Sequence, residues 1–241
     1  MKWALIIGAS GDIGQQIARD LAQDGWSLYL HYHQNTDKIR NLAQELQMEY
    51  AKQDFLTLQY DLTDCEHLEQ ITNNLFALDA VIFAQGTTWY SLFSELPAGQ
   101  LSTMLKMQVE TPLLLLQKLE TKLTRSPNGR IVFIGSIYGG VGSAMEVGYS
   151  TVKGALSAFV SAYSKEVASL GITVNVVAPG AVDTQMNMTF AAEEKAAVAA
   201  EIPVGRFAKV SEISYWVQSL LSEKADYLTG QTLYVTGGWL K

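Results

Sequence analysis

Short apolar segments alternate with amphipathic segments along almost the whole chain, and this alternation is the feature that most constrains the fold. Repeated strand–helix units predict a parallel sheet with helices on both faces. We therefore expect an α/β fold, a three-layer Rossmann-type doubly wound parallel sheet of about seven strands. The predicted strands run 3–7, 26–33, 55–60, 79–83, 130–135, 172–178 and 231–235. The predicted helices run 15–23, 38–50, 66–75, 101–122, 149–170 and 212–221.

The length of 241 residues suits one large α/β domain, and the chain contains no internal repeat, low-complexity tract or linker. We expect residues 1–241 to form a single domain. A long irregular segment over 181–207 is expected to be a lid or substrate loop, because such segments in compact domains often bind ligands. The alternative is a surface helix pair, since 191–200 is rich in alanine with Glu and Lys, and both can be true of one segment.

Charge and composition exclude several classes of partner. The net charge of −7 disfavours binding to nucleic acid, because an acidic surface repels phosphate backbones. The apolar N-terminal segment and the leucine run 113–116 are too short to span a membrane. One cysteine excludes an internal disulfide, and the sequence has no Cys/His cluster, so we expect no metal site. A cytoplasmic protein without membrane association is the simplest interpretation.

The first turn between a strand and a helix is rich in glycine and reads Gly8-Ala9-Ser10-Gly11-Asp12-Ile13-Gly14. Glycine lets another group approach the backbone closely, and the following helix offers free N–H groups to a pyrophosphate. Since the turn follows a predicted strand and opens a predicted helix, it indicates dinucleotide binding. Asp12 would repel a pyrophosphate, so its side chain should point away from the phosphates, with capping of the helix as one role for it.

The end of the second strand indicates which dinucleotide binds. An acid there would hold a ribose 2′-OH and repel a 2′-phosphate. This strand ends Leu30-His31-Tyr32-His33-Gln34-Asn35, without an acid. Ser10, His33 and Lys38 could contact a phosphate, although His31 and His33 could equally be ordinary strand residues. The missing acid favours NADP (NADPH) over NAD, with Tyr32 and His33 as cofactor contacts.

Three side chains predict carbonyl chemistry. Tyr149 and Lys153 lie four residues apart on a predicted helix and therefore share a face. A neighbouring cation should lower the pKa of the Tyr149 phenol toward a useful range, so that Tyr149 donates a proton to a carbonyl oxygen as hydride arrives. Ser136 follows a predicted buried strand, at the edge where parallel sheets bind ligands, and can polarise the same oxygen.

Together these motifs resemble the short-chain dehydrogenase/reductase family over essentially the whole chain. The resemblance implies that the glycine turn binds the cofactor and that Asp61 and Leu62 contact its adenine. It also implies that Ser136, Tyr149 and Lys153 form the catalytic triad.

Near the C-terminus, the resemblance implies that the segment containing Pro179, Gly180, Val182 and Thr184 orients the nicotinamide carboxamide. Residues 227–231 and 237–238 resemble the signature of the subgroup that contains bacterial 3-oxoacyl-acyl-carrier-protein reductases.

Three positions depart from the family pattern. Asp12 stands where the pattern has glycine. The family's fourth strand usually ends Asn-Asn-Ala-Gly, whereas here it ends Phe83-Ala84-Gln85-Gly86, and we expect Ala84, Gln85 and Gly86 to contact the cofactor. The family's fourth catalytic residue is an Asn in the long helix before the Ser136 strand, and this position falls on Gln108. A longer amide could still hold the relay water.

A narrower resemblance is to the 5-aminopentanone reductases of elongation factor P, in which NADPH reduces a ketone on a modified lysine of that factor. It is carried by residues 30–32, 136–139, 146–149, 178–184 and 201–206. The sister interpretation is reduction of 3-oxoacyl groups on acyl carrier protein. Carrier-protein reductases use arginines to grip the acidic carrier, but the corresponding positions hold Leu170 and about Pro127, with Arg125 and Arg130 nearby, which weakens that interpretation.

The leading hypothesis is therefore an NADPH-dependent ketone reductase acting on modified elongation factor P, followed by a 3-oxoacyl-acyl-carrier-protein reductase. A dinucleotide-binding regulator without catalysis is a third hypothesis, which Gln108 mildly favours and the intact triad disfavours. The family resemblance also implies a homotetramer assembled through the leucine run 113–116 and the apolar helix 155–163, for which core packing is the simpler explanation.

Overall fold

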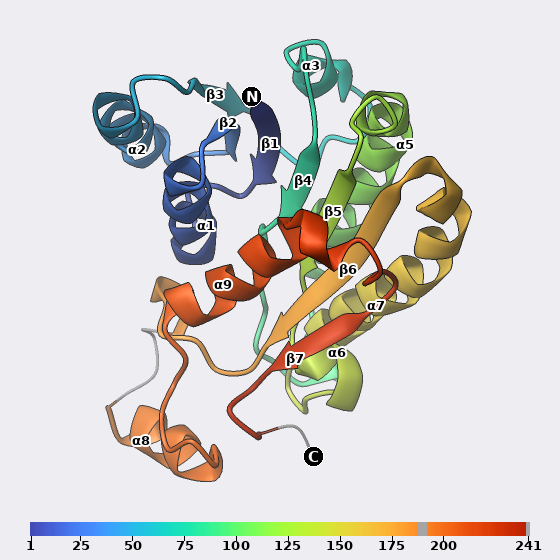
Figure 1. Cartoon of the computed structure of the whole chain (residues 1–241). Helices are drawn as coiled ribbons and strands as arrows, with labels where there is room; N and C mark the ends of the chain where they lie inside the picture. The colour runs from blue at the N-terminus through green and yellow to red at the C-terminus, as the bar shows by residue number, and fades with distance from the viewer. Residues whose placement is uncertain (188–191, 240–241) are drawn as a thin grey trace.

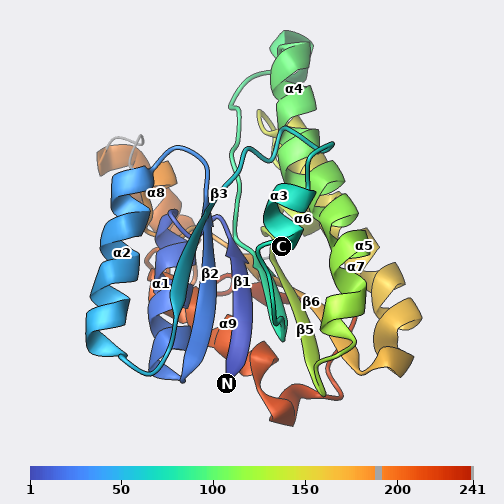
Figure 2. The same ribbon diagram turned by 90° about the horizontal axis from the view of Figure 1, so that it is seen from above.

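The computed structural model describes residues 1–187 and 192–239, and within them all seven strands belong to one parallel sheet with the order β3-β2-β1-β4-β5-β6-β7. Helices cover both faces of the sheet, as Figures 1 and 2 show. This arrangement confirms the expected doubly wound Rossmann-type fold. The strands are β1 (Lys2–Ile7), β2 (Trp26–Tyr32), β3 (Phe55–Gln59), β4 (Ala80–Phe83), β5 (Gly129–Ile134), β6 (Ile172–Pro179) and β7 (Thr232–Val235).

Helices lie between successive strands, including in the long segment between β6 and β7. The α-helices are α1 (Asp12–Gln23), α2 (Thr36–Glu49), α3 (Glu69–Thr72), α4 (Ala98–Leu105), α5 (Thr111–Leu123), α6 (Tyr138–Val141), α7 (Val147–Val167), α8 (Ala192–Glu201) and α9 (Val210–Leu221). Short 3₁₀ turns lie at η1 (Phe93–Glu95), η3 (Ala168–Leu170), η4 (Gln185–Asn187) and η5 (Glu223–Ala225). No helix in these described parts is long and apolar enough to cross a membrane.

Two predicted helices differ from the structure. The helix expected over 66–75 shrinks to the four residues of α3, because Asn73 and Asn74 are poor helix formers and the Asn74 side chain donates back to the Gln70 carbonyl. The long helix expected over 101–122 is interrupted by a π-helical turn, η2 (Lys106–Glu110). Pro112 has no N–H to donate to the carbonyl four residues earlier, so the α-helical ladder breaks at this point.

The central strands are buried almost continuously, so both faces of the sheet are apolar. Helices α1, α2 and α9 pack on one face, where Ile17 and Leu28 belong to the same buried cluster. Helices α5 and α7 cover the other face, where the rings of Phe83 and Phe133 stack with centroids 4.5 Å apart. Each fully buried side chain of this size stabilises the fold by about 1.5–3 kcal/mol.

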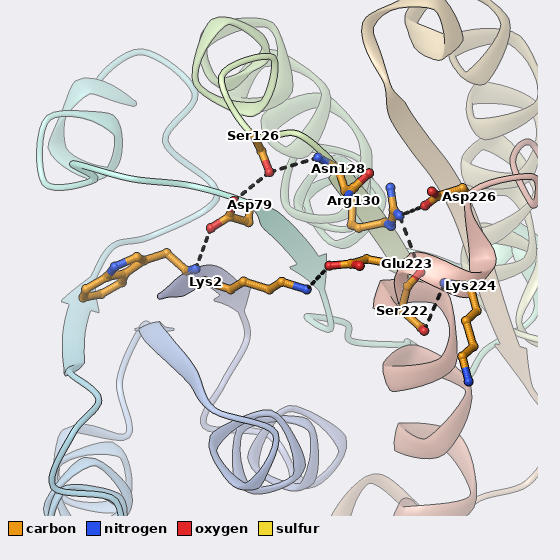
Figure 3. Close-up of polar contacts among 10 residues, drawn as sticks. Lys2, Asp79, Ser126, Asn128, Arg130, Ser222, Glu223, Lys224 and Asp226 are labelled. Atoms are coloured by element: carbon orange, nitrogen blue, oxygen red, sulfur yellow. Dashed lines mark hydrogen bonds and ion pairs between the residues drawn. The ribbon is translucent and has the colours of Figure 1, made fainter.

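Polar side chains tie the amino ends of the strands together at one edge of the sheet (Figure 3). The Asp79 carboxylate accepts hydrogen bonds from the Trp3 N–H (2.8 Å) and the Ser126 hydroxyl (2.6 Å). Arg130 is buried and pairs with Asp226 beyond α9. These contacts join β1, β4 and β5 to the segment before β7, and they leave the carboxyl edge of the sheet free for a ligand.

Candidate active site

A cavity of about 760 Å³ opens at the carboxyl ends of the strands. The strand order reverses between β1 and β4, and ligands bind at such a switch point in open α/β sheets. Almost every residue predicted to contact the cofactor lines this cavity, together with Ser136, Tyr149 and Lys153. The predicted cofactor contacts among the lining residues are Gly8, Ser10, Gly11, Asp12, Ile13, Tyr32, His33, Asp61, Leu62, Ala84, Gln85, Gly86, Pro179, Gly180, Val182 and Thr184.

Two glycines of the first turn are required by close packing. Gly8 has φ +81°, and a Cβ there would lie 2.6 Å from the Gln85 backbone nitrogen. A Cβ on Gly14 would lie 2.3 Å from the Gly8 carbonyl oxygen, so Gly14 packs the start of α1 against the turn and does not line the cavity. Helix α1 begins at Asp12 with Gly11 as its N-cap and no side-chain cap. Its first N–H groups can therefore serve a pyrophosphate, as a dinucleotide site requires.

His31 holds the glycine turn in place. Its Nδ1 accepts a hydrogen bond from the Gly8 N–H at 3.1 Å, so its Nε2 carries the proton and donates to the Tyr60 carbonyl at 3.1 Å. Burial lowers the pKa of the imidazole to about 4, which keeps His31 neutral at pH 7. Local sequence pattern could not predict this role, because the bonded partners lie 23 and 29 residues away.

The adenosine end of the cavity carries both signs of charge. His33 at the end of β2 lies 3.6 Å from the Asp61 carboxylate, and Lys38 lies 3.3 Å from Asp12. Asn35 also lines this end. The Asp12 carboxylate does not cap α1; it lines the cavity and accepts a hydrogen bond from the Gln185 N–H at 2.7 Å. The capping role is therefore wrong, and the orientation of Asp12 relative to the phosphates stays a prediction.

Tyr149 and Lys153 share one face of α7, as their spacing predicts. The Lys153 ammonium lies 5.5 Å from the centroid of the Tyr149 ring and donates to the Ile134 carbonyl at 2.9 Å. Ser136 follows β5 and forms a side-chain hydrogen bond with Tyr149. The Ser136 hydroxyl also accepts from the Tyr138 N–H at 3.2 Å. A carbonyl oxygen placed here would meet a hydroxyl and a phenol together.

The pKa of Tyr149 is raised, not lowered, and this corrects the sequence-based expectation. Burial raises it to about 12, which outweighs the lowering effect of the hydrogen bond from Ser136. Lys153 is itself desolvated, which lowers the pKa of its ammonium to about 8, and it donates to a backbone carbonyl. The phenol is therefore held protonated at neutral pH, which is the form that can donate a proton.

Gln108 lies behind the cavity wall, on the π-helical turn η2, and does not line the cavity. Its Nε2 donates to the Thr87 carbonyl at 2.8 Å. Its buried Oε1 has no protein partner among the described residues. A Cβ added to Gly86 would lie 3.3 Å from this oxygen and 3.5 Å from the Lys153 ammonium, so the two polar atoms flank one point. The neighbouring residue Gln85 also bonds to η2, since its Nε2 donates to the Met107 carbonyl at 3.3 Å.

The mouth of the cavity contains residues to which the sequence analysis assigned no individual role. Tyr138 and Trp239 pack edge to face with ring centroids 6.1 Å apart. Glu146 accepts from the Thr88 hydroxyl at 2.8 Å, which joins the segment before α7 to the segment after β4. Tyr138 and Glu146 belong to segments that carry the narrower resemblance, but only the fold brings these residues together at the cavity. From the segment 181–207, Gln185, Met186, Glu194, Val198 and Phe207 line the cavity, whereas 188–191 lie outside the described residues.

The glycine cradle, the uncapped start of α1 and the groups around Tyr149 fit a nicotinamide dinucleotide in the cavity. Comparison with known proteins agrees. An uncharacterized oxidoreductase of Bacillus subtilis, YmfI, is 40% identical over 239 residues, covering 99% of this chain and 98% of that protein. The 3-oxoacyl-acyl-carrier-protein reductase FabG of Escherichia coli is 31% identical and covers 98% of this chain and 96% of its own length.

A crystal structure of the 3-oxoacyl-acyl-carrier-protein reductase from Brucella melitensis superposes with a TM-score of 0.92 at 21% identity, covering 100% of this chain and 91% of that chain. This likeness supports the fold. The family model described as short chain dehydrogenase matches residues 2–195. The chain therefore belongs to the short-chain dehydrogenase family and is an oxidoreductase acting on CH–OH and C=O groups.

Proposed function

We propose that this protein is an NADPH-dependent ketone reductase. The observation that carries the proposal is the environment of the Tyr149 phenol, which has a pKa of about 12 and lies beside the Ser136 hydroxyl and the Lys153 ammonium. Reduction of a ketone requires a proton for the oxygen while the carbon gains hydride, and a protonated phenol can supply that proton. Bound NADPH would supply the hydride.

Each side chain takes one part of the reaction. Ser136 donates a hydrogen bond to the ketone oxygen and polarises it. Tyr149 donates its proton to that oxygen and is left as a phenolate. The Lys153 ammonium, 5.5 Å from the ring, stabilises the phenolate. The phenolate then regains a proton from solvent, and Gln108 is the proposed relay residue because its unpartnered Oε1 and the Lys153 ammonium flank one point beside Gly86.

NADPH is the proposed cofactor because the adenosine end of the cavity offers two basic side chains, His33 and Lys38, and no acid at the end of β2. Ser10 and Asn35 line the same end and can donate hydrogen bonds to a 2′-phosphate. Asp61 and Leu62 would contact the adenine. Val182 and Thr184 after β6 would meet the nicotinamide carboxamide.

The proposed substrate is the ketone on a modified lysine of elongation factor P. The alternative is a 3-oxoacyl group on acyl carrier protein, which the similarity to the Escherichia coli 3-oxoacyl-acyl-carrier-protein reductase favours. The exposed Leu170 and Pro127 would give an acidic carrier no positive charge to bind. Of the two arginines near the second position, Arg130 is buried against Asp226 and is not available to a partner, whereas Arg125 is exposed.

A direct comparison of substrates tests this proposal. Purified enzyme with NADPH is supplied with ketone-bearing elongation factor P in one arm and with an acetoacetyl thioester in the other, and NADPH oxidation and product mass are measured. We expect turnover of the modified factor. Robust turnover of the thioester alone would reject the leading substrate and support the alternative. Turnover of neither, with NADPH still bound, would count against a reductase of either kind.

We also propose that the chain forms one catalytic domain and assembles as a cytoplasmic homotetramer. Much of the predicted interface on α5 and α7 is core, since Leu115, Leu116 and Leu156 are buried. Exposed aromatic side chains gather instead on α9 and around the edge strand β7, which favours assembly through that edge as well. They are Tyr215, Trp216, Tyr227 and Tyr234. Light scattering after size-exclusion chromatography measures the assembly, and a monomer at micromolar concentration would contradict it.

A further inference from the structure

Asp12 makes two contacts that join the glycine turn to distant parts of the chain. It is the first residue of α1, at a position where the family pattern has glycine. Its Oδ1 lies 3.3 Å from the Lys38 ammonium of α2. Its Oδ2 accepts a hydrogen bond from the Gln185 N–H at 2.7 Å, across 173 residues of sequence. One partly buried carboxylate thus bridges α1, α2 and the segment that follows β6.

The segment Thr184–Met186, which we call the lid root, forms part of the cavity wall. The residue before it, Asp183, is bonded through its N–H to the Ala208 carbonyl and through its carboxylate to Lys195 of α8. Those contacts join parts of the segment between β6 and α9 to one another. The bond from Gln185 to Asp12 holds it to the glycine turn, on the other side of the cavity. Lys38 and Asp12 line the cavity between them.

A simpler role for Asp12 is electrostatic. A carboxylate in the first turn of a helix stabilises the helix through the helix dipole. That role requires the negative charge of Asp12 and does not depend on the hydrogen bond from the Gln185 N–H. A role in fastening the lid root needs an oxygen acceptor and not necessarily a charge. The two roles therefore respond differently to asparagine, which keeps the acceptor and removes the charge.

We propose that Asp12 is a positioning residue that fastens the lid root to the glycine turn and thereby holds the cavity wall in its nucleotide-binding form. The proposal rests on the proposed binding of NADPH in this cavity. A wall that is already fastened loses less conformational freedom when the nucleotide binds, so binding costs less free energy. The backbone N–H of Gln185 donates and the carboxylate of Asp12 accepts, while Lys38 offsets the carboxylate's charge beside the phosphates.

Limited proteolysis of the cofactor-free protein tests the fastening itself. Trypsin cleavage after Lys195 requires α8 to open, because the Lys195 side chain is paired with Asp183 and packs over the Phe207 ring. We expect Asp12→Asn to be cleaved there at close to the wild-type rate and Asp12→Ala about fivefold faster, because the oxygen that accepts the Gln185 N–H is lost only in alanine. Cleavage after Lys153, which is buried in α7, reports global unfolding and should not change.

The same bond can be removed from its other end. Gln185 is the first residue of the turn η4, a position that tolerates proline. Gln185→Pro deletes the donating N–H and leaves Asp12 and Lys38 intact, whereas Gln185→Ala keeps the N–H. We expect Gln185→Pro to behave as Asp12→Ala and Gln185→Ala to behave as wild type. This pair keeps the test decisive if Asp12→Ala does not fold.

Nucleotide affinity provides the second measurement. The Kd for NADPH, read from its fluorescence, should be about threefold or more weaker in Asp12→Ala than in Asp12→Asn, and in Gln185→Pro than in Gln185→Ala. Equal affinities and equal cleavage rates within each pair would overturn the proposal, as would tighter binding in Asp12→Ala. Neither readout requires turnover, so an enzyme that reduced no ketone could still satisfy this test, and the two proposals can fail separately.

Discussion

Removing the Lys153 ammonium should stabilise the folded protein at neutral pH while destroying its activity. Lys153 is 3% exposed, and burial lowers its pKa from 10.5 to about 8. Each pKa unit corresponds to about 1.4 kcal/mol, so keeping this charge in the folded state opposes folding by about 3 kcal/mol at pH 7. Lys153→Met also leaves the Ile134 carbonyl without its donor, which costs about 1–2 kcal/mol. The expected net gain is about 1–2 kcal/mol.

The pH dependence separates this effect from ordinary repacking. Lysine has the lower pKa in the folded state, so between pH 8 and pH 10.5 the unfolded chain binds more protons and the wild type gains stability as pH rises. From pH 7 to pH 10 the wild type should gain about 2–3 kcal/mol relative to Lys153→Met. The variant should therefore be the more stable protein at pH 7 and the less stable one at pH 10.

Urea unfolding of both proteins at pH 7, 8, 9 and 10, followed by circular dichroism, measures the difference directly. Lys153→Gln is a matched control that removes the charge but keeps a hydrogen-bond donor near the Ile134 carbonyl. It should show the same pH dependence with a larger gain at pH 7. A difference between wild type and Lys153→Met that stays constant across this range would refute the reasoning.

Other predictions concern the reaction. Tyr149→Phe should lower kcat by about 10²–10⁴-fold without weakening NADPH binding measured by fluorescence, and equal activity in that variant would remove Tyr149 from the mechanism. The kcat/KM for ketone reduction should fall as pH rises through about 8, because Lys153 loses its charge there while Tyr149 stays protonated, and a flat profile up to pH 10 would contradict this assignment. His33→Asp should shift the ratio of kcat/KM values from NADPH toward NADH by about tenfold, since it places a carboxylate where a 2′-phosphate would bind. Gln108→Leu should lower kcat by about tenfold or more with little change in KM, whereas Gln108→Asn should retain most activity; similar losses in both would indicate a packing role.

Local pattern determined much of the architecture in advance. The buried segment before Gly8, the glycine turn and the amphipathic segment after it predict β1, the turn and α1 because neighbouring residues alone specify hydrophobic period and backbone freedom. The four-residue spacing of Tyr149 and Lys153 likewise places both on one face of α7, since a helix has a fixed period. Local pattern did not predict the π-helical turn at Gln108, although Pro112 lies close to the point where the α-helical hydrogen bonds are interrupted.

Tertiary structure decided what those side chains experience. Burial is a property of residues far apart in sequence, so the raised pKa of Tyr149 and the lowered pKa of Lys153 follow from the packed cavity and not from their spacing. For the same reason the sequence did not predict the role of His31, whose partners lie beyond other strands, or of Trp239, which the fold brings to the cavity mouth from the end of the chain. The sequence by itself determined which elements form and in what order, whereas the assembled sheet determined the electrostatics of the site, because desolvation and long-range contacts exist only after the chain has folded.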